Sequence, residues 1–203
     1  GEEMSKETFL SFYREHIARA GSAELLEYLE RSDFFSAPAS TRFHGAYEGG
    51  LCEHSLNVFY ELNELVKARP LPEWACRYDT NPICPNADFL ETIAICGLLH
   101  DLCKIGFYTV STRNVKNDQT GQWEKKPYYA VDDKLPYGHG EKSVFMIERY
   151  MRLTIEEAMA IRFHMGEYSD QNTSRAFEKN PLALFLHQAD ERATFLDEKE
   201  EDK

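Results

Sequence analysis

The stretch Ile95-Cys96-Gly97-Leu98-Leu99-His100-Asp101-Leu102-Cys103-Lys104 decides what kind of protein this chain forms. Its apolar half predicts a buried helical segment. The segment ends in an adjacent imidazole and carboxylate, and Lys104 follows Asp101 by three residues. Imidazole and carboxylate ligands together suit a divalent transition metal ion, and such an ion can activate water. A His-Asp pair alone does not specify a metal site, so further ligands are required elsewhere in the chain.

Four further side chains of ligand type lie in segments that read as helices or helix starts: His54, His139, His164 and Asp190. Asp190 ends the apolar run 183–190, where an unpaired carboxylate is costly. Antiparallel helices can bring such groups together inside a bundle. We therefore expect one metal ion to be held by four side chains: His54, His100, Asp101 and Asp190. For His139 and His164, ligation of a second ion and hydrogen bonding to a substrate phosphate remain open alternatives.

Each of these residues also has an ordinary structural interpretation. A lone buried histidine is more often a hydrogen-bonded core residue than a metal ligand. Asp101 can be a helix-end carboxylate, and Asp190 can pair with Arg192. The ordered series of His, His-Asp, His, His and Asp on successive helices favours the metal site over these separate interpretations.

The periodicity of apolar residues predicts helices through most of the chain. The expected helical ranges are 6–20, 22–29, 50–67, 88–100, 139–152, 155–164 and 181–196. Ser22 is the expected cap of the second helix, and Thr154-Ile155-Glu156-Glu157 is a capping box. Strand-like residues on either side of Gly121 predict a β-hairpin inserted at 107–137. The expected fold class is therefore all-α, a helical bundle with a small inserted β-hairpin.

A single domain is expected over residues 1–203, with N-terminal helices in 1–40. Residues 88–91 resemble a further capping box, and the proline-rich range 69–86 is expected to form an irregular connection. Asn180 followed by Pro181 is expected to open the last helix. The acidic tail 197–203, which includes Glu198, is expected to be a solvated and frayed end.

The composition indicates a globular chain, with 42% hydrophobic residues and a net charge of −12. No run approaches the roughly 18 apolar residues of a membrane helix, so no membrane association is expected. The acidic charge argues against a broad binding surface for duplex nucleic acid, since such surfaces are usually basic. The five cysteines fit no disulfide framework, which points to the cytoplasm. Zinc binding by Cys76 and Cys84 is a weaker alternative to ordinary thiols.

Five local motifs carry a resemblance to a known family. They are Ala46-Tyr47-Glu48-Gly49-Gly50-Leu51-Cys52-Glu53-His54-Ser55, Leu98-Leu99-His100-Asp101-Leu102-Cys103-Lys104-Ile105, Gly138-His139, Phe163-His164-Met165-Gly166 and Ala189-Asp190. In this order they resemble the motifs of the HD-domain metal-dependent phosphohydrolases. Their local sequences are similar to those of the HD domain in YhaM-type 3′-5′ exoribonucleases, where glycine is usual in place of Cys103.

The resemblance implies an HD-domain helical bundle and a specific set of roles. The first divalent ion would be held by His54, His100, Asp101 and Asp190. Asp101 would bridge to a second ion held by His139 and His164, and Lys104 would contact phosphate. Asp101 and Lys104 are thus the expected catalytic residues. One or two ions are expected, with Mn, Fe, Ni, Co, Zn and Mg as the candidate metals.

The expected function is hydrolysis of a phosphate ester, with a nucleotide or short oligonucleotide as the partner molecule. Arg42 and His44, just ahead of the first ligand helix, are expected to contact this substrate together with Lys104. Basic and aromatic residues of the insert, such as Arg113 and Tyr128, either meet the substrate or serve ordinary surface and packing roles. Three alternatives remain open: a 3′-5′ ribonuclease, a non-catalytic nucleotide-sensing module and a di-iron HD-fold oxygenase.

Overall fold

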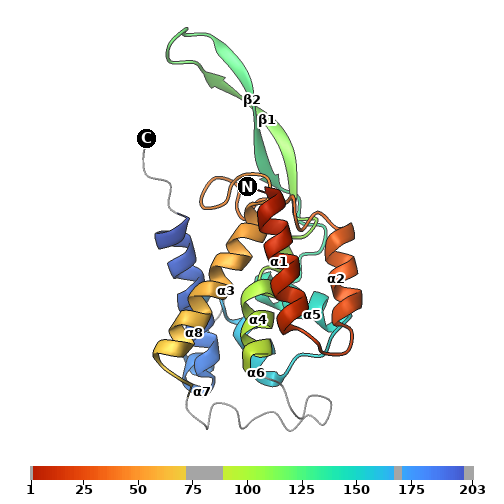
Figure 1. Ribbon diagram of the computed structural model, residues 1–203. Helices are drawn as coiled ribbons and strands as arrows, with labels where there is room; N and C mark the ends of the chain where they lie inside the picture. The colour runs from red at the N-terminus through yellow and green to blue at the C-terminus, as the bar shows by residue number, and fades with distance from the viewer. Residues whose placement is uncertain (1, 72–88, 167–170, 199–203) are drawn as a thin grey trace.

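A body of helices carries one long β-hairpin that projects from it (Figure 1). The computed structural model describes residues 2–71, 89–166 and 171–198. The helices of the described part are α1 (Glu2–His16), α2 (Ser22–Arg31), α3 (Gly50–Ala68), α4 (Phe89–Leu99), α5 (His139–Glu148), α6 (Ile155–Arg162), α7 (Thr173–Lys179) and α8 (Pro181–Arg192). A 3-10 turn, η2 (Leu102–Lys104), follows α4, and a π-helical turn, η4 (Ala193–Asp197), follows α8. The predicted class, mostly helical with a small antiparallel sheet, is confirmed.

Local signals account for several helix boundaries. The capping box at the start of α6 is confirmed, since Thr154 Oγ1 accepts from the Glu157 N–H and the Glu157 carboxylate accepts from the Thr154 N–H. Pro181 stands at the first helical position of α8, where its missing N–H costs nothing. Ser22 as the cap of α2 is wrong by one residue. Gly21 takes that place with a left-handed φ of 88°, a conformation that glycine adopts without a steric penalty.

Other boundaries differ from the predicted ranges. Helix α1 ends at His16, and α5 ends at Glu148, because the chain turns before each predicted end. Helix α7 was not predicted, since its short range shows no long apolar repeat. The predicted capping box at 88–91 begins outside the described residues. Cys76, Cys84 and most of the connection 69–86 also lie outside them.

The core is built around α3 and α4, which pack against each other and against α1. Gly97 makes this close packing possible, because a Cβ atom at that position would lie 2.6 Å from Phe59 Cα of α3. Helix α8 packs on the other side of α3 and also contacts α6 (Figure 1). Segments distant in the sequence therefore meet in one place. The residue after α4, His100, lies beside His54 in the first turns of α3 and near Asp190 at the end of α8.

The predicted hairpin is confirmed. Strands β1 (Tyr108–Lys116) and β2 (Trp123–Val131) pair antiparallel, with Tyr108 opposite Val131 and Lys116 opposite Trp123. At its base the Tyr108 hydroxyl donates to Ala39 O at 3.1 Å, and beyond this contact the strands extend away from the body (Figure 1). None of the helices in the described ranges is long and apolar enough to cross a membrane.

Candidate metal centre

The six predicted ligands come from five helices or their flanking turns and lie together in the core. His54 is in α3, Asp190 is in α8, and His139 is the first residue of α5. The rest sit where helices end: His100 and Asp101 just after α4, and His164 just after α6. Within the groups His54–His100–Asp190 and His100–Asp101–His164, one ligand atom of each residue lies within 4.8 Å of those of the others. The sequence predicted these residues in helices or at helix starts; His100, Asp101 and His164 instead follow the helix ends, and the packing of the helices brings the side chains together.

All four histidines of the cluster turn the same ring atom, Nε2, toward this point. His100 Nδ1 donates to Gly97 O at 2.9 Å, and His164 Nδ1 donates to Ile161 O at 2.7 Å. A neutral imidazole that donates from Nδ1 carries a lone pair on Nε2. His100 Nε2 lies 3.3 Å from His54 Nε2, and His164 Nε2 is buried without a hydrogen-bond partner in the described chain. The Nε2 atoms of His54, His100 and His164 therefore converge on one point beside Asp101.

The Asp101 carboxylate lies near all four histidines of the cluster. Its oxygens lie 2.9 Å from His139 Nε2, 3.4 Å from His164 Nε2 and 3.5 Å from the Nε2 atoms of His54 and His100. Lys104 Nζ lies 2.6 Å from Asp101 Oδ2. Burial raises the pKa of the Asp101 carboxyl, but Lys104 and the surrounding histidines lower it by more, so that the pKa is well below its usual range. Asp101 is therefore an ionised carboxylate with two oxygens directed at different histidines.

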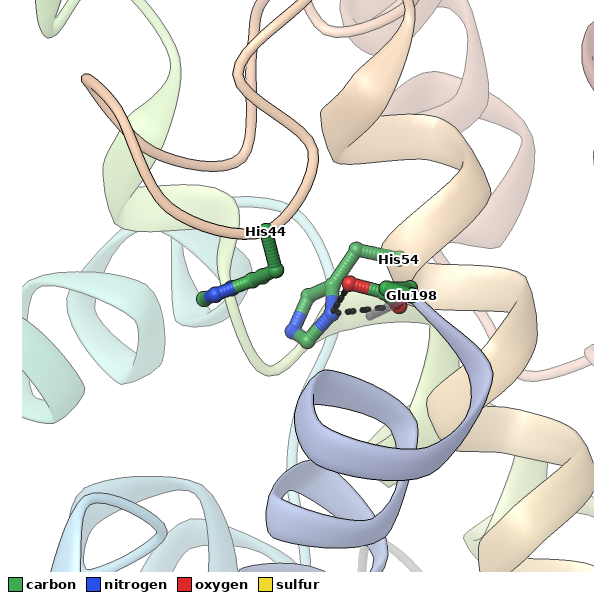
Figure 2. Close-up of side chains that lie close together, drawn as sticks. All are labelled: His44, His54 and Glu198. Atoms are coloured by element: carbon green, nitrogen blue, oxygen red, sulfur yellow. Dashed lines mark hydrogen bonds and ion pairs between the residues drawn. The ribbon is translucent and has the colours of Figure 1, made fainter. Parts of the chain in front are cut away.

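His54 is held from behind by Glu198, a residue that was expected to be solvated. The Glu198 carboxylate is 3% exposed and accepts from His54 Nδ1 at 3.0 Å and from Asn57 Nδ2 at 3.0 Å. Figure 2 shows Glu198 reaching from the end of the chain segment after α8 to the His54 ring, with His44 nearby. The prediction of a frayed end is thus wrong for Glu198. With Nδ1 held by Glu198, His54 Nε2 points to Asp190 Oδ1 at 3.1 Å.

The pKa values of His54 and His100 differ widely within the cluster. Burial lowers the pKa of His54, but hydrogen bonds to Asp190 and Glu198 raise it by more, to about 10. Burial lowers the pKa of His100 to about 3. Without a metal ion, a proton on His54 is the cation that separates the Asp190 carboxylate from the His100 lone pair. A divalent ion in this place would serve all of these acceptors at once.

Cys103 is a possible ligand that sequence reasoning missed. Its Sγ lies 3.4 Å from His139 Nδ1, and Asp101, Cys103 and His139 form a further group of ligand atoms within 4.8 Å of one another. Burial raises the pKa of the Cys103 thiol to about 12, so the free side chain is a thiol and not a thiolate. The signal in the sequence was its position between Asp101 and Lys104, where the resembling family usually has glycine.

A cavity of about 370 Å³ opens over the cluster. Its walls include Asp101, Lys104, His139, His164 and Asp190. The remaining lining residues come from the loop before α3, the hairpin base, the turn after α6, helix α8 and the turn η4. His44 lines this cavity with a buried Nε2 that has no hydrogen-bond partner among the described residues. Burial lowers the pKa of His44, so its ring is neutral at pH 7. His44 is therefore positioned to meet a bound molecule.

Two predicted contacts are placed elsewhere. Arg42 does not line this cavity, and it borders a neighbouring one with Arg113 and Tyr128. Asp190 pairs with His54, while Arg192 pairs with Glu61, so the alternative pairing of Asp190 with Arg192 is wrong. His187, next to the site, donates from Nδ1–H to His164 O at 2.8 Å and supports the turn after α6.

The donor set fits a divalent transition metal. It combines imidazole nitrogens with carboxylate oxygens, and three of the histidines have their second ring nitrogen held by a carboxylate or a backbone carbonyl, as is usual for metal-bound histidines. His54, His100, Asp101 and Asp190 can hold one ion, and Asp101 and His139, with His164 or Cys103, offer ligands for a second. Comparisons of the chain with family models, with curated proteins and with solved structures returned no match in any of the three.

Proposed function

We propose that this protein is a metal-dependent phosphohydrolase that acts on a nucleotide or a short oligonucleotide. The observation that carries the proposal is the buried cluster of imidazole and carboxylate acceptors at the floor of a cavity that also holds Lys104. A divalent ion held by His54, His100, Asp101 and Asp190 would supply a hydroxide nucleophile near neutral pH and would withdraw charge from phosphoryl oxygens.

Two side chains of the cavity, Lys104 and His44, would bind the substrate. Lys104 lines the cavity with its ammonium group 2.6 Å from Asp101, and burial lowers its pKa while Asp101 raises it by more, so it stays charged. Its positive charge can offset the charge of a phosphate placed in the cavity. The neutral His44 ring offers a hydrogen-bonding nitrogen in the same cavity. A cavity of about 370 Å³ has the size of a small-molecule site.

The resemblance of the sequence to HD-domain phosphohydrolases supports the same chemistry. The residues that carry the resemblance, such as His54, His100, Asp101 and Asp190, are also residues of the buried cluster. Retention of Lys104 beside Asp101 favours catalysis over a structural metal, because a structural site needs no cation at the cavity wall.

Two variants test the assignment. Asp101→Ala removes the central carboxylate, so metal retention and hydrolysis should both be lost. Lys104→Ala should retain metal and lose turnover, because a protonated amine cannot be a ligand. Lys134→Ala, an exposed lysine outside this cavity, is the matched control. Elemental analysis of protein purified without chelator would measure metal content, and a panel of phosphomonoesters and phosphodiesters would measure turnover. Full metal content and full turnover in Asp101→Ala would refute the site.

The same panel separates the alternatives. Degradation of single-stranded RNA from its 3′ end, with small nucleotides inert, would favour a ribonuclease. Nucleotide binding without turnover at any metal would favour a sensing module. A pair of iron ions with oxygen-dependent substrate loss would favour an oxygenase.

A further inference from the structure

A second cavity lies beside the candidate metal centre, between the loop before α3 and the hairpin. It measures about 270 Å³ and is lined by Thr41, Arg42, Arg113, Tyr128, Tyr129 and Ala130. The two cavities are neighbours, because Thr41 lines both, and the adjacent β2 residues Ala130 and Val131 line one each. A molecule bound with one end at the metal centre can therefore extend into the second cavity.

The second cavity is positively charged in a chain that is acidic. Acidic residues outnumber basic ones by 35 to 23 in the whole sequence, yet the cavity is lined by two arginines and no carboxylate. Neither arginine forms an ion pair with a residue in the described part of the chain. Arg113 lies over the Tyr128 ring at 5.4 Å and Arg42 over the Phe43 ring at 5.7 Å. Stacking on a ring face leaves the guanidinium N–H donors available to an anion.

The pairing of the strands adds a third basic side chain to the same face of the hairpin. Arg113 is directly opposite Lys126. Tyr128 is opposite Ser111, two residues nearer the body along each strand. Side chains directly opposite each other share a face, and like charges in that relation destabilise a sheet. A two-stranded hairpin has little stability of its own to offset this. A bound anion would remove the repulsion.

We propose that this second cavity is a subsite for a further phosphate of the substrate, held by Arg42 and Arg113, with the attached nucleoside against Tyr128. The inference rests on the proposed function and narrows it. The substrate class then carries at least two phosphates, as a nucleoside diphosphate or a phosphate-bearing dinucleotide does, and a simple phosphomonoester occupies the metal centre alone.

Binding of three probes to the full chain, measured by calorimetry, tests the subsite. The probes are thymidine 5′-monophosphate, thymidine 5′-diphosphate and a 5′-phosphorylated thymidine dinucleotide with a phosphorothioate linkage. At least one of the two-phosphate probes should bind about 10-fold tighter than the monophosphate, as expected for charge-assisted hydrogen bonds. Arg113→Ala should abolish this gain and leave monophosphate binding within about 2-fold, and the probe that loses affinity identifies the source of the second phosphate.

Two further variants keep the test decisive. Arg42→Ala changes the same cavity from a different element, so it should have the same effect even if Arg113→Ala weakens the hairpin. Lys125→Ala removes an equal charge from the opposite face of the hairpin, where Lys125 pairs with Asn114, and should leave every affinity unchanged. If Lys125→Ala and Arg113→Ala lost the same affinity for the two-phosphate probes, the subsite would be overturned. It would also be overturned if Arg113→Ala weakened monophosphate binding as much as it weakened two-phosphate binding.

Failure of the subsite is distinguishable from failure of the proposed function. Metal-dependent hydrolysis of p-nitrophenyl phosphate, with no gain in affinity from a second phosphate, would overturn the subsite alone. No hydrolysis of any phosphate ester with any divalent metal would overturn the proposed function. An Arg113-dependent gain in affinity would still support the subsite in that case, since binding is measured without turnover.

Discussion

Glu198 is the residue on which the orientation of His54 depends. Its carboxylate binds Nδ1 of the ring and is itself held by Asn57, which leaves Nε2 directed at the cluster. A carboxylate behind a histidine ligand fixes the ring and raises its basicity. The orientation of His54, a candidate ligand, therefore depends on a side chain that follows α8.

We expect Glu198→Ala to weaken metal binding by about 10- to 100-fold, the usual effect of losing such a partner. Glu198→Gln should lose less, because its side-chain oxygen can still accept from Nδ1–H. Asp197→Ala is the matched control, since this neighbouring carboxylate is exposed and should leave metal affinity unchanged. Titration of chelator-treated protein with Mn²⁺ or Zn²⁺ would measure the affinities. Wild-type affinity in Glu198→Ala would show that His54 does not need this contact.

The pH dependence of stability follows from the pKa of His54, which Glu198 helps to raise. The pKa of His54 rises from 6.5 to about 10 on folding of the metal-free chain. A raised pKa contributes stability that is fully present below pH 6.5 and is lost as the pH rises to 10. A metal ion must displace this proton, so its affinity should rise over the same window. His100, with a pKa of about 3, adds no proton to the competition.

In melting experiments between pH 6.5 and 9, chelated protein should therefore lose stability as the pH rises. The gain in melting temperature on adding metal should increase with pH, because the stabilisation by a bound ion grows with the logarithm of its affinity. A metal-induced gain that shrinks with rising pH would contradict the assignment of the proton to His54.

At the scale of elements, Gly97 sets the distance between α3 and α4. The absence of a side chain there lets the α4 backbone approach Phe59, and the same helix then delivers His100 and Asp101 beside His54. The apolar run predicted that this segment is a buried helix. It did not predict which helix face would meet α3, because that depends on residues far away in the sequence.

Gly97→Ala should destabilise the protein. Alanine has the better helix propensity by about 1 kcal/mol, but forcing a methyl group into a packed core costs up to about 3 kcal/mol. We expect the steric cost to win, because the added Cβ would lie 2.6 Å from Phe59 Cα and the clash is with backbone. Chemical denaturation should show a net loss of about 2 kcal/mol in the free energy of unfolding. Unchanged stability would mean that the two helices can separate without cost.

At the scale of the whole molecule, Arg19 links three separate parts of the chain. From the turn between α1 and α2 it donates to Glu91 of α4 at 2.8 Å and to both carboxylate oxygens of Glu157 in α6. Glu157 is fully buried and also accepts from Thr92. These contacts connect the turn between α1 and α2 to α4 and α6, the helices that precede His100 and His164.

Arg19→Ala should cost about 3–5 kcal/mol of unfolding free energy, because it leaves the Glu157 carboxylate buried without its cation. Arg152→Ala is the matched control, since the Arg152–Glu148 pair is exposed and such pairs contribute at most about 1 kcal/mol. Urea denaturation of both variants would measure the difference. Equal losses would show that Glu157 finds another partner.

The sequence by itself determined the features that depend on neighbours a few positions apart. The capping box at Thr154 and the hairpin around Gly121 are confirmed, because each depends on contacts within a short stretch of chain. The residues Asp101 and Asp190 could be singled out because a carboxylate in an apolar run needs a partner.

Only the tertiary structure decided which distant side chains meet. Glu198 and His54 are 144 positions apart, and no local pattern distinguishes this glutamate from the other acidic residues near the end of the chain. The contact of Cys103 with His139 and the joining of Arg42 and Arg113 in one cavity have the same origin. Each of these contacts arises from helix packing or from the direction in which the hairpin leaves the body, and both are set by the close packing of the core and not by local periodicity.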